Sequence, residues 1–245
     1  MSGGGFGDQR HLIGSFSEAF VGYWSSGDRN FSPGLERVVD YWLHYHVVKA
    51  VIAATLLAVL ITLGVLLWKA FVRAGGFGAG RTAAIASAGA VVTALGLISL
   101  AAVMANIQGA IAPLSSLVSM LPMHSSPGAL ADTLGQVRQH MADYPNAGTR
   151  TPPAVEVMVG DFSRYHLVIA VAAPMVAVVL IGMSVMSWRR FARAEKSDRR
   201  ARRIFTSFGL LWALLSLAFI VLAVANVSVA AEPTPALLAF FEGGW

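Results

Sequence analysis

Four long runs without a charged residue alternate with polar stretches along the chain. They cover residues 50–68, 83–112, 167–188 and 204–231, which are 19, 30, 22 and 28 residues long. A helix needs about 20 apolar residues to cross a hydrocarbon core of roughly 30 Å. Helices in soluble protein cores rarely reach such lengths without a charge. The pattern therefore predicts four transmembrane helices.

Basic residues are concentrated in two of the segments between these runs. The 69–81 loop carries three basic residues and no acid, and the 189–203 loop carries eight basic residues against two acidic ones. The 1–49 tail and the 113–166 loop carry nearly equal numbers of the two signs. Because positively charged loops stay in the cytoplasm, we expect a multi-pass plasma-membrane protein with both termini and the 113–166 loop extracytoplasmic.

Composition agrees with a membrane protein. Hydrophobic residues make up 56% of the 245 residues and charged residues only 13%, whereas soluble domains carry about 25% charged residues. The net charge of +5 does not indicate nucleic acid, because the basic residues lie in short loops where they orient the chain. The absence of cysteine excludes disulfides and thiolate metal sites. We therefore expect a lipid bilayer as the main partner.

The polar segments contain weaker helical signals. Ser126-Pro127, followed by apolar residues at helical spacing as far as Met141, predicts an amphipathic helix of about fifteen residues that Pro145 should end. Pro33 opens a second amphipathic stretch, which we expect to lie in the headgroup region and bend into the first span. The apolar 237–241 segment is too short to span a bilayer and is expected at its interface.

The chain resembles itself when it is shifted by 120 residues. Between positions 45 and 74 there are 14 identities in 30 positions without a gap, whereas composition alone would give about four or five. The shared residues include a Tyr-His pair and a Trp-x-x-Phe-x-Arg motif, which composition does not supply. These matches predict that the chain arose by duplication of one unit.

The duplication predicts the architecture. Each copy crosses the membrane twice, so both copies insert with the same orientation, and such parallel repeats are related by an axis along the membrane normal. We expect an all-α integral membrane protein whose four transmembrane helices form two tandem like-oriented hairpins in a pseudo-two-fold bundle. The predicted repeat units are 1–122, with spans about 50–68 and 83–112, and 123–245, with spans about 167–188 and 204–231.

The repeat also brings polar residues to equivalent positions at the outer ends of the spans. At 1.5 Å per helical residue, the asparagines should reach the level of the Tyr-His pairs. The candidate binding residues are His46, His166, Tyr45, Tyr165, Asn106 and Asn226. Two facing imidazoles on a pseudo-axis could hold a haem or another metal group. Alternatively, the Tyr and His rings belong to the interfacial belt and the Asn side chains bond between helices, with no cofactor.

The functional prediction follows from what the spans lack. The spans contain no ionisable residue, which disfavours ion-coupled transport. The sequence also lacks a nucleophile motif of the kind that indicates an enzyme. We expect a structural or accessory component, or a binder of lipid or a hydrophobic ligand. The alternatives are a small haem or metal-binding protein using His46 and His166, and an uncoupled carrier of lipid or a small apolar solute. Anionic lipids at the 189–203 loop or another membrane protein are the expected partners.

Overall fold

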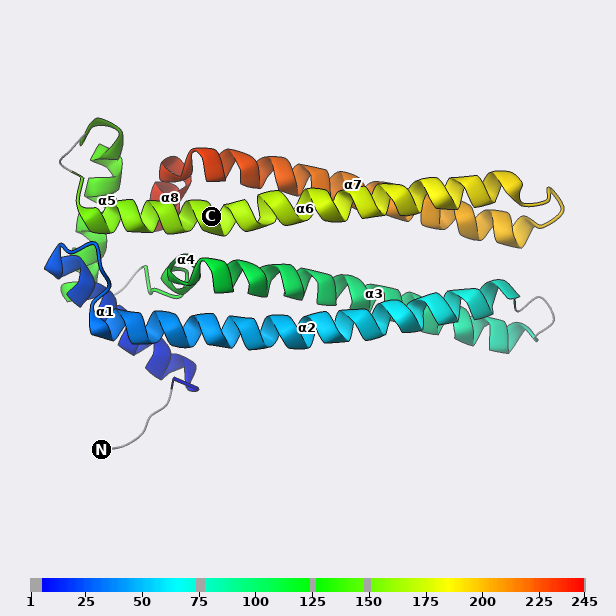
Figure 1. Cartoon of the computed structure of the whole chain (residues 1–245), viewed down its shortest axis with the longest axis horizontal. Coiled ribbons are helices and arrows are strands. Elements are labelled where there is room, and N and C mark those ends of the chain that lie inside the picture. Colours follow the sequence, from blue (N-terminus) through cyan, green and yellow to red (C-terminus); the bar gives the residue numbers. More distant parts are fainter. Residues whose placement is uncertain (1–5, 74–77, 124–126, 148–150, 245) are drawn as a thin grey trace. The chain divides into compact units, whose positions relative to one another are not determined.

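The computed structural model describes residues 6–73, 78–123, 127–147 and 151–244. Within these residues the regular secondary structure is helical (Figure 1). The helices are α1 (Gln9–Ser26), α2 (Pro33–Arg73), α3 (Ala79–Ile111), α4 (Pro113–Val118), α5 (Ala129–Ala147), α6 (Pro153–Arg193), α7 (Arg199–Ala231) and α8 (Pro233–Phe241).

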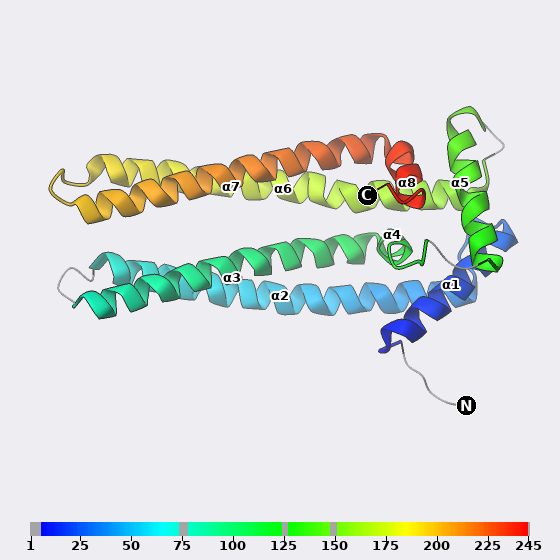
Figure 2. The same ribbon diagram turned by 180° about the vertical axis from the view of Figure 1, so that it is seen from behind.

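Four of these helices are long and apolar enough to cross a membrane, namely α2, α3, α6 and α7. They lie in pairs, α2 beside α3 and α6 beside α7, in both views (Figures 1 and 2). Large aliphatic side chains on them are turned outward, and Ile98, Met175 and Val178 are 66–68% exposed. Exposed apolar surface of this extent on helices of spanning length indicates contact with lipid. The prediction of four membrane-spanning helices in a lipid bilayer is confirmed at this level.

Helices α2 and α6 are longer than a membrane requires. Each has 41 residues, or about 60 Å, which is twice the thickness of a hydrocarbon core. The expected bend after Pro33 was wrong, because α2 continues from Pro33 to Arg73 without a break. Proline at a helix start costs no hydrogen bond, since the first N–H groups have no helical partner. A hydrocarbon core can therefore cover only about half of α2.

The chain divides into two compact units. Unit 1 contains the described residues as far as Val47, those between Ile107 and Ala170, and those from Ala225 onward. Unit 2 contains Val48–Asn106 and Val171–Val224. Helices α1, α4, α5 and α8 belong to unit 1. Each unit has its own kind of packing.

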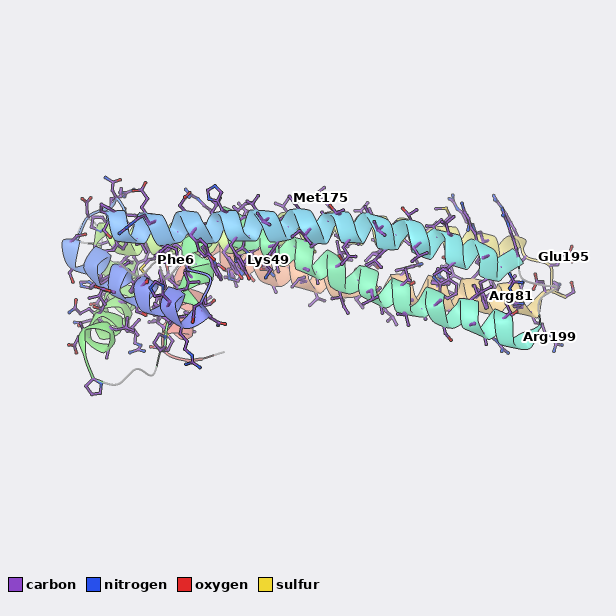
Figure 3. The ribbon with its side chains drawn as sticks, turned by 90° about the horizontal axis from the view of Figure 1, so that it is seen from below. Phe6, Lys49, Arg81, Met175, Glu195 and Arg199 are labelled. Carbon is purple, nitrogen blue, oxygen red and sulfur yellow. The ribbon has the colours of Figure 1, made fainter. Side chains whose placement is uncertain are left out.

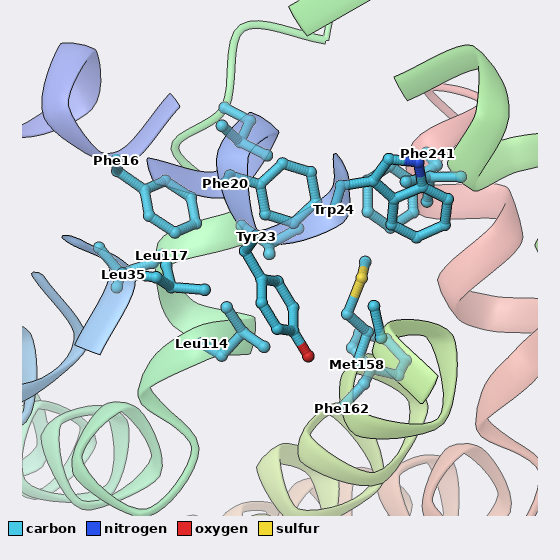
Figure 4. Close-up of a cluster of buried hydrophobic side chains, with 14 of the residues drawn as sticks. Phe16, Phe20, Tyr23, Trp24, Leu35, Leu114, Leu117, Met158, Phe162 and Phe241 are labelled. Atoms are coloured by element: carbon cyan, nitrogen blue, oxygen red, sulfur yellow. The ribbon is translucent and has the colours of Figure 1, made fainter. Parts of the chain in front are cut away.

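Unit 1 has a large hydrophobic core built around α1 (Figure 4). Phe16 and Phe20 are fully buried and their rings lie 5.9 Å apart. Tyr23 is also fully buried, and its hydroxyl donates to the carbonyl of Arg29. Burial raises the pKa of the Tyr23 hydroxyl, with a smaller contribution from the charge of Asp28. The core also takes residues from the other helices of the unit: Leu35, Leu114, Leu117, Leu134, Val155, Met158 and Phe241.

Helix α1 was not among the expected elements. Its first turn is capped by Asp8, whose Oδ1 accepts a hydrogen bond from the N–H of Arg10 at 2.8 Å. Its end is set by Gly27, which has φ of 65°, a left-handed conformation that glycine adopts at no steric cost. The N-terminal segment is therefore a packed part of unit 1 rather than a plain tail.

Polar side chains join the outer helices of unit 1. The indole Nε1 of Trp24 in α1 donates to Oε1 of Gln136 in α5 at 2.8 Å. Nε of Arg138 in α5 donates to the carbonyl of Phe241 at the end of α8 at 2.6 Å. Helix α5 differs from the expected helix, because it begins at Ala129 and continues through Pro145 to Ala147. Pro145 lies in the last turn, where the helix ends two residues later.

Unit 2 is packed through two tryptophans that lie on glycines of the neighbouring helix. A Cβ atom at Gly89 would lie 3.0 Å from Cε2 of Trp68, and one at Gly209 would lie 2.9 Å from Cε2 of Trp188. The indole of Trp68 also donates to Oγ1 of Thr93 at 3.1 Å. Glycine is required at both positions for the indole ring to approach the helix backbone.

The two helical pairs also meet within unit 2, near the basic loops. The ring of Phe208 in α7 lies 4.6 Å from that of Trp68 in α2. Arg200 stacks on Phe71 at 4.5 Å and donates to its carbonyl at 3.1 Å. Figure 3 shows Arg81 and Arg199 at this end of the unit. At least one arginine of the 189–203 loop thus takes part in packing.

Helix boundaries recur at an interval of 120 residues. Helices α1, α2, α3 and α4 begin at residues 9, 33, 79 and 113, and α5, α6, α7 and α8 begin at 129, 153, 199 and 233. The residues before α4 and α8 share a backbone conformation, with φ and ψ of −129° and 69° at Ala112 and −127° and 73° at Glu232. The interval found in the sequence is therefore also the interval between helix starts.

Candidate functional site

The two repeat-equivalent histidines lie among aromatic rings of their own helices. In α6, the ring of His166 lies 4.6 Å from that of Phe162, four residues earlier, at an interplanar angle of 65°. In α2, the ring of His46 lies 4.8 Å from that of Trp42 at 81°. Residues four apart share one face of a helix, which explains both contacts. Each histidine is thus held in an edge-to-face arrangement.

His166 is further fixed by an asparagine of the next helix. Its Nδ1 lies 2.9 Å from Oδ1 of Asn226 in α7. An amide oxygen can only accept a hydrogen bond, so Nδ1 of His166 donates in this contact, and in the neutral imidazole Nε2 is then the acceptor. Two of the sequence-predicted residues are therefore bonded to each other.

His46 has a different neighbour. Its ring lies against Gly109 of α3, where a Cβ atom would come within 2.7 Å of Cε1, and its Nε2 atom is buried. The equivalent of Gly109 in the second half is Val229, so this close approach is confined to the first half. The two histidines therefore occupy different environments.

The tyrosines and asparagines among the candidate residues also have different surroundings in the two halves. Tyr45 is 40% exposed and its ring stacks on Trp42. The carbonyl of Tyr165 accepts a hydrogen bond from Nε2 of Gln108 at 3.0 Å, which links α3 to α6. Nδ2 of Asn106, in unit 2, donates to the carbonyl of Ala102 in its own helix at 2.7 Å.

A pocket of about 260 Å³ opens in unit 1 between α4, α6 and α8. Two of the predicted residues, Tyr165 and His166, line it, whereas His46 does not. The rest of the lining is largely apolar and aromatic. The full lining is Leu114, Ser115, Val118, Ser119, Met158, Phe162, Tyr165, His166, Leu237 and Phe240.

Three polar side chains of the pocket, Ser115, Ser119 and His166, have their donors engaged within the protein, whereas the Tyr165 hydroxyl is a further polar group that can both donate and accept. The hydroxyl and the backbone N–H of Ser115 both donate to Oδ2 of Asp161 at 2.7 Å. The hydroxyl of Ser119 donates to the carbonyl of Ser116 at 2.6 Å, and Nδ1 of His166 is engaged by Asn226. Ser115, Ser119 and His166 can therefore still accept hydrogen bonds from a ligand. Among the described residues, no Asp, Glu, Lys or Arg lines the pocket.

No protein-family model, curated protein or solved structure matches this chain. Among the described residues, no three His, Asp or Glu side chains gather in a way that could hold a metal ion. The site is therefore interpreted from its own geometry.

Sequence reasoning identified Tyr165, His166 and Asn226 but not the pocket around them. The serines and Asp161 were overlooked because nothing local in the sequence shows that Ser115 and Asp161, 46 residues apart, are bonded. Gln108 and Gly109 lie two and three residues after Asn106. Their only sequence signal was a polar amide and a glycine near the end of an apolar run.

Proposed function

We propose that this protein is a non-enzymatic, multi-pass membrane protein that binds a neutral, largely apolar molecule carrying a hydroxyl group. The binding site is the unit 1 pocket between α4, α6 and α8. The observation that carries the proposal is the combination of an apolar aromatic wall with a few polar groups, among them a His166 ring whose Nδ1 is engaged by Asn226. Pockets for small molecules have this composition, with a few polar groups that fix orientation.

The chemistry of the lining selects the ligand class. A charged headgroup would lose its hydration without meeting an opposite charge, because none of the described residues that line the pocket is Asp, Glu, Lys or Arg, and this loss is costly. A pure hydrocarbon would leave the acceptor Nε2 of His166 without a partner among ligand atoms. A ligand hydroxyl can donate to Nε2 of His166, while the apolar chain of the ligand packs against Met158, Phe162 and Phe240. A long-chain alcohol therefore represents the ligand class.

Photolabelling tests this proposal directly. A photoreactive fatty alcohol is expected to label α4, α6 and α8 more strongly than its methyl ether, which has the same apolar chain but no donor. His166→Phe should reduce alcohol labelling by about three- to tenfold, as expected for one lost hydrogen bond, and bring it to the level of the ether. Peptide mapping by mass spectrometry gives the readout.

A variant at the edge of the pocket tests the proposal even if His166→Phe fails to fold. Ser119 is exposed and lines the pocket, so Ser119→Phe should block entry and lower labelling by both probes. Val227→Phe introduces the same side chain at an exposed position of unit 1 outside the described lining and should leave labelling unchanged. Equal labelling by alcohol and ether in the unaltered protein, or full labelling in Ser119→Phe, would contradict the proposal.

The same proposal includes the origin and orientation of the chain. Residues 1–122 and 123–245 are two copies of one unit, and their hairpins enter the plasma membrane in the same direction. Both termini and the 113–166 segment are extracytoplasmic, and the basic loops are cytoplasmic. The constant interval of 120 residues between helix starts and the paired Trp–Gly contacts support the duplication.

The alternative of a haem or metal held by both histidines receives no comparable support. His46 lies against the backbone at Gly109 and does not line the pocket that contains His166. A ligand held from both halves needs the two imidazoles at one cavity. The hydroxyl-bearing ligand needs only His166.

A further inference from the structure

Unit 2 contains an apolar groove on the first helical pair. It has a volume of about 340 Å³ and is lined only by residues of α2 and α3. Its sides are open, since the lining residues Ile52 and Ile98 are 62% and 66% exposed. Its lining is Lys49, Ile52, Ala53, Leu56, Leu60, Leu95, Ile98, Ser99, Ala102 and Asn106. The groove therefore offers apolar surface to the bilayer.

Small residues create this groove, and the second half of the chain replaces them. The floor includes Ser99, which is buried and donates to the carbonyl of Ala53 at 2.9 Å. At the interval of 120 residues, Ser99 corresponds to Phe219 and Ala102 to Leu222. Both replacements are larger and would fill the space. We therefore expect less space at the equivalent place in the second half.

Lys49 is the one charged side chain among the described residues that line the groove. Lys49 is exposed and precedes 19 residues without a charge, and Figure 3 shows it in α2, away from the end of the helical pair where Arg81 of α3 lies. Its counterpart in the second half is Ile169. The half that contains this groove therefore also has an ammonium group at the groove's end. Lysine at a membrane surface attracts anionic lipid headgroups.

We propose that the groove binds one acyl chain of an anionic phospholipid, whose phosphate contacts the ammonium group of Lys49. The chain lies along Leu56, Leu60 and Leu95, and the headgroup remains at the level of Lys49. A zwitterionic lipid fits the apolar part equally well but gains less from the ammonium group. This inference concerns unit 2 and is independent of the hydroxyl-binding pocket of unit 1.

Photolabelling in lipid nanodiscs provides an internal comparison between the two halves. The probes are phosphatidylglycerol and phosphatidylcholine that carry the same diazirine in one acyl chain. With phosphatidylglycerol, labelling of residues 52–60 and 95–102 should exceed that of residues 172–180 and 215–222 by about fivefold, the effect of about 1 kcal/mol for one Lys near a charged surface. Phosphatidylcholine should show a smaller excess.

Two variants carry residues that the chain already uses in its other half. Lys49→Ile should reduce the phosphatidylglycerol excess to the phosphatidylcholine level, and Ala102→Leu should reduce labelling of the groove by both lipids. Lys69→Ile, at the other end of the same charge-free run and outside the lining, is the matched control and should leave the excess intact. Equal labelling of the two halves in the unaltered protein, or an excess that survives Lys49→Ile, would overturn the proposal.

Discussion

Phe20→Ala is expected to destabilise unit 1 by about 3–5 kcal/mol, the usual cost of removing a buried phenyl ring and leaving a cavity. Phe20 is fully buried and lies among α1 residues that form much of the unit 1 core (Figure 4). Hydrogen–deuterium exchange measures the effect. Protection of α1 and α5 should fall strongly, because Trp24 and Gln136 join these two helices.

Glu18→Ala provides the matched control on the same helix. Glu18 is exposed, and alanine favours helix slightly more than glutamate does, so protection should stay unchanged. If Phe20→Ala left exchange in α1 at the level of Glu18→Ala, α1 would not be part of a packed core.

Gly209→Ala should disrupt the packing of α6 against α7 in unit 2. The new methyl group would lie 2.9 Å from Cε2 and Nε1 of Trp188, so the indole ring must move. Overpacking of this kind costs about 1–3 kcal/mol. Thermal unfolding of the detergent-solubilised protein, followed by tryptophan fluorescence, should show a lower melting temperature.

Gly182→Ala is the control that separates the steric clash at Gly209 from the general effect of replacing glycine by alanine in a helix. No atom outside its own helix backbone lies within 4 Å of a Cβ atom at Gly182, so Gly182→Ala should be neutral or stabilise the helix by up to about 1 kcal/mol. Adding Trp188→Leu to Gly209→Ala should cost less than the sum of the two single changes, because the clash disappears. Strict additivity would argue against the Trp–Gly contact.

The spans were predictable because their signal is local. A run without charge, such as 167–188, indicates a bilayer helix without knowledge of its neighbours. The level of Asn226 relative to His166 was also predictable, because the helical rise fixes it. The helix ends were less clear. Charges between 36 and 49 suggested a boundary, yet α2 is continuous from Pro33, because a charged helix outside the hydrocarbon is stable when its apolar face is packed.

Helix α1 had a readable signal that was not used. Asp8 and Gly27 are good capping residues, and the buried Leu12, Phe16 and Phe20 recur every four residues, as expected for one face of a helix. The pocket had no such signal. It depends on α4, α6 and α8 meeting, and on the bond between Ser115 and Asp161, which sequence spacing does not determine.

Single-cysteine labelling tests the central claim of two like-oriented hairpins most directly, because the chain has no native cysteine. The positions are Ser25 in α1, Gly78 in the first basic loop and Ser197 in the second. With a membrane-impermeant maleimide, Ser25→Cys should react in intact cells, whereas Gly78→Cys and Ser197→Cys should react only after lysis. Reaction of Ser197→Cys in intact cells, or opposite behaviour of the two loops, would contradict the account.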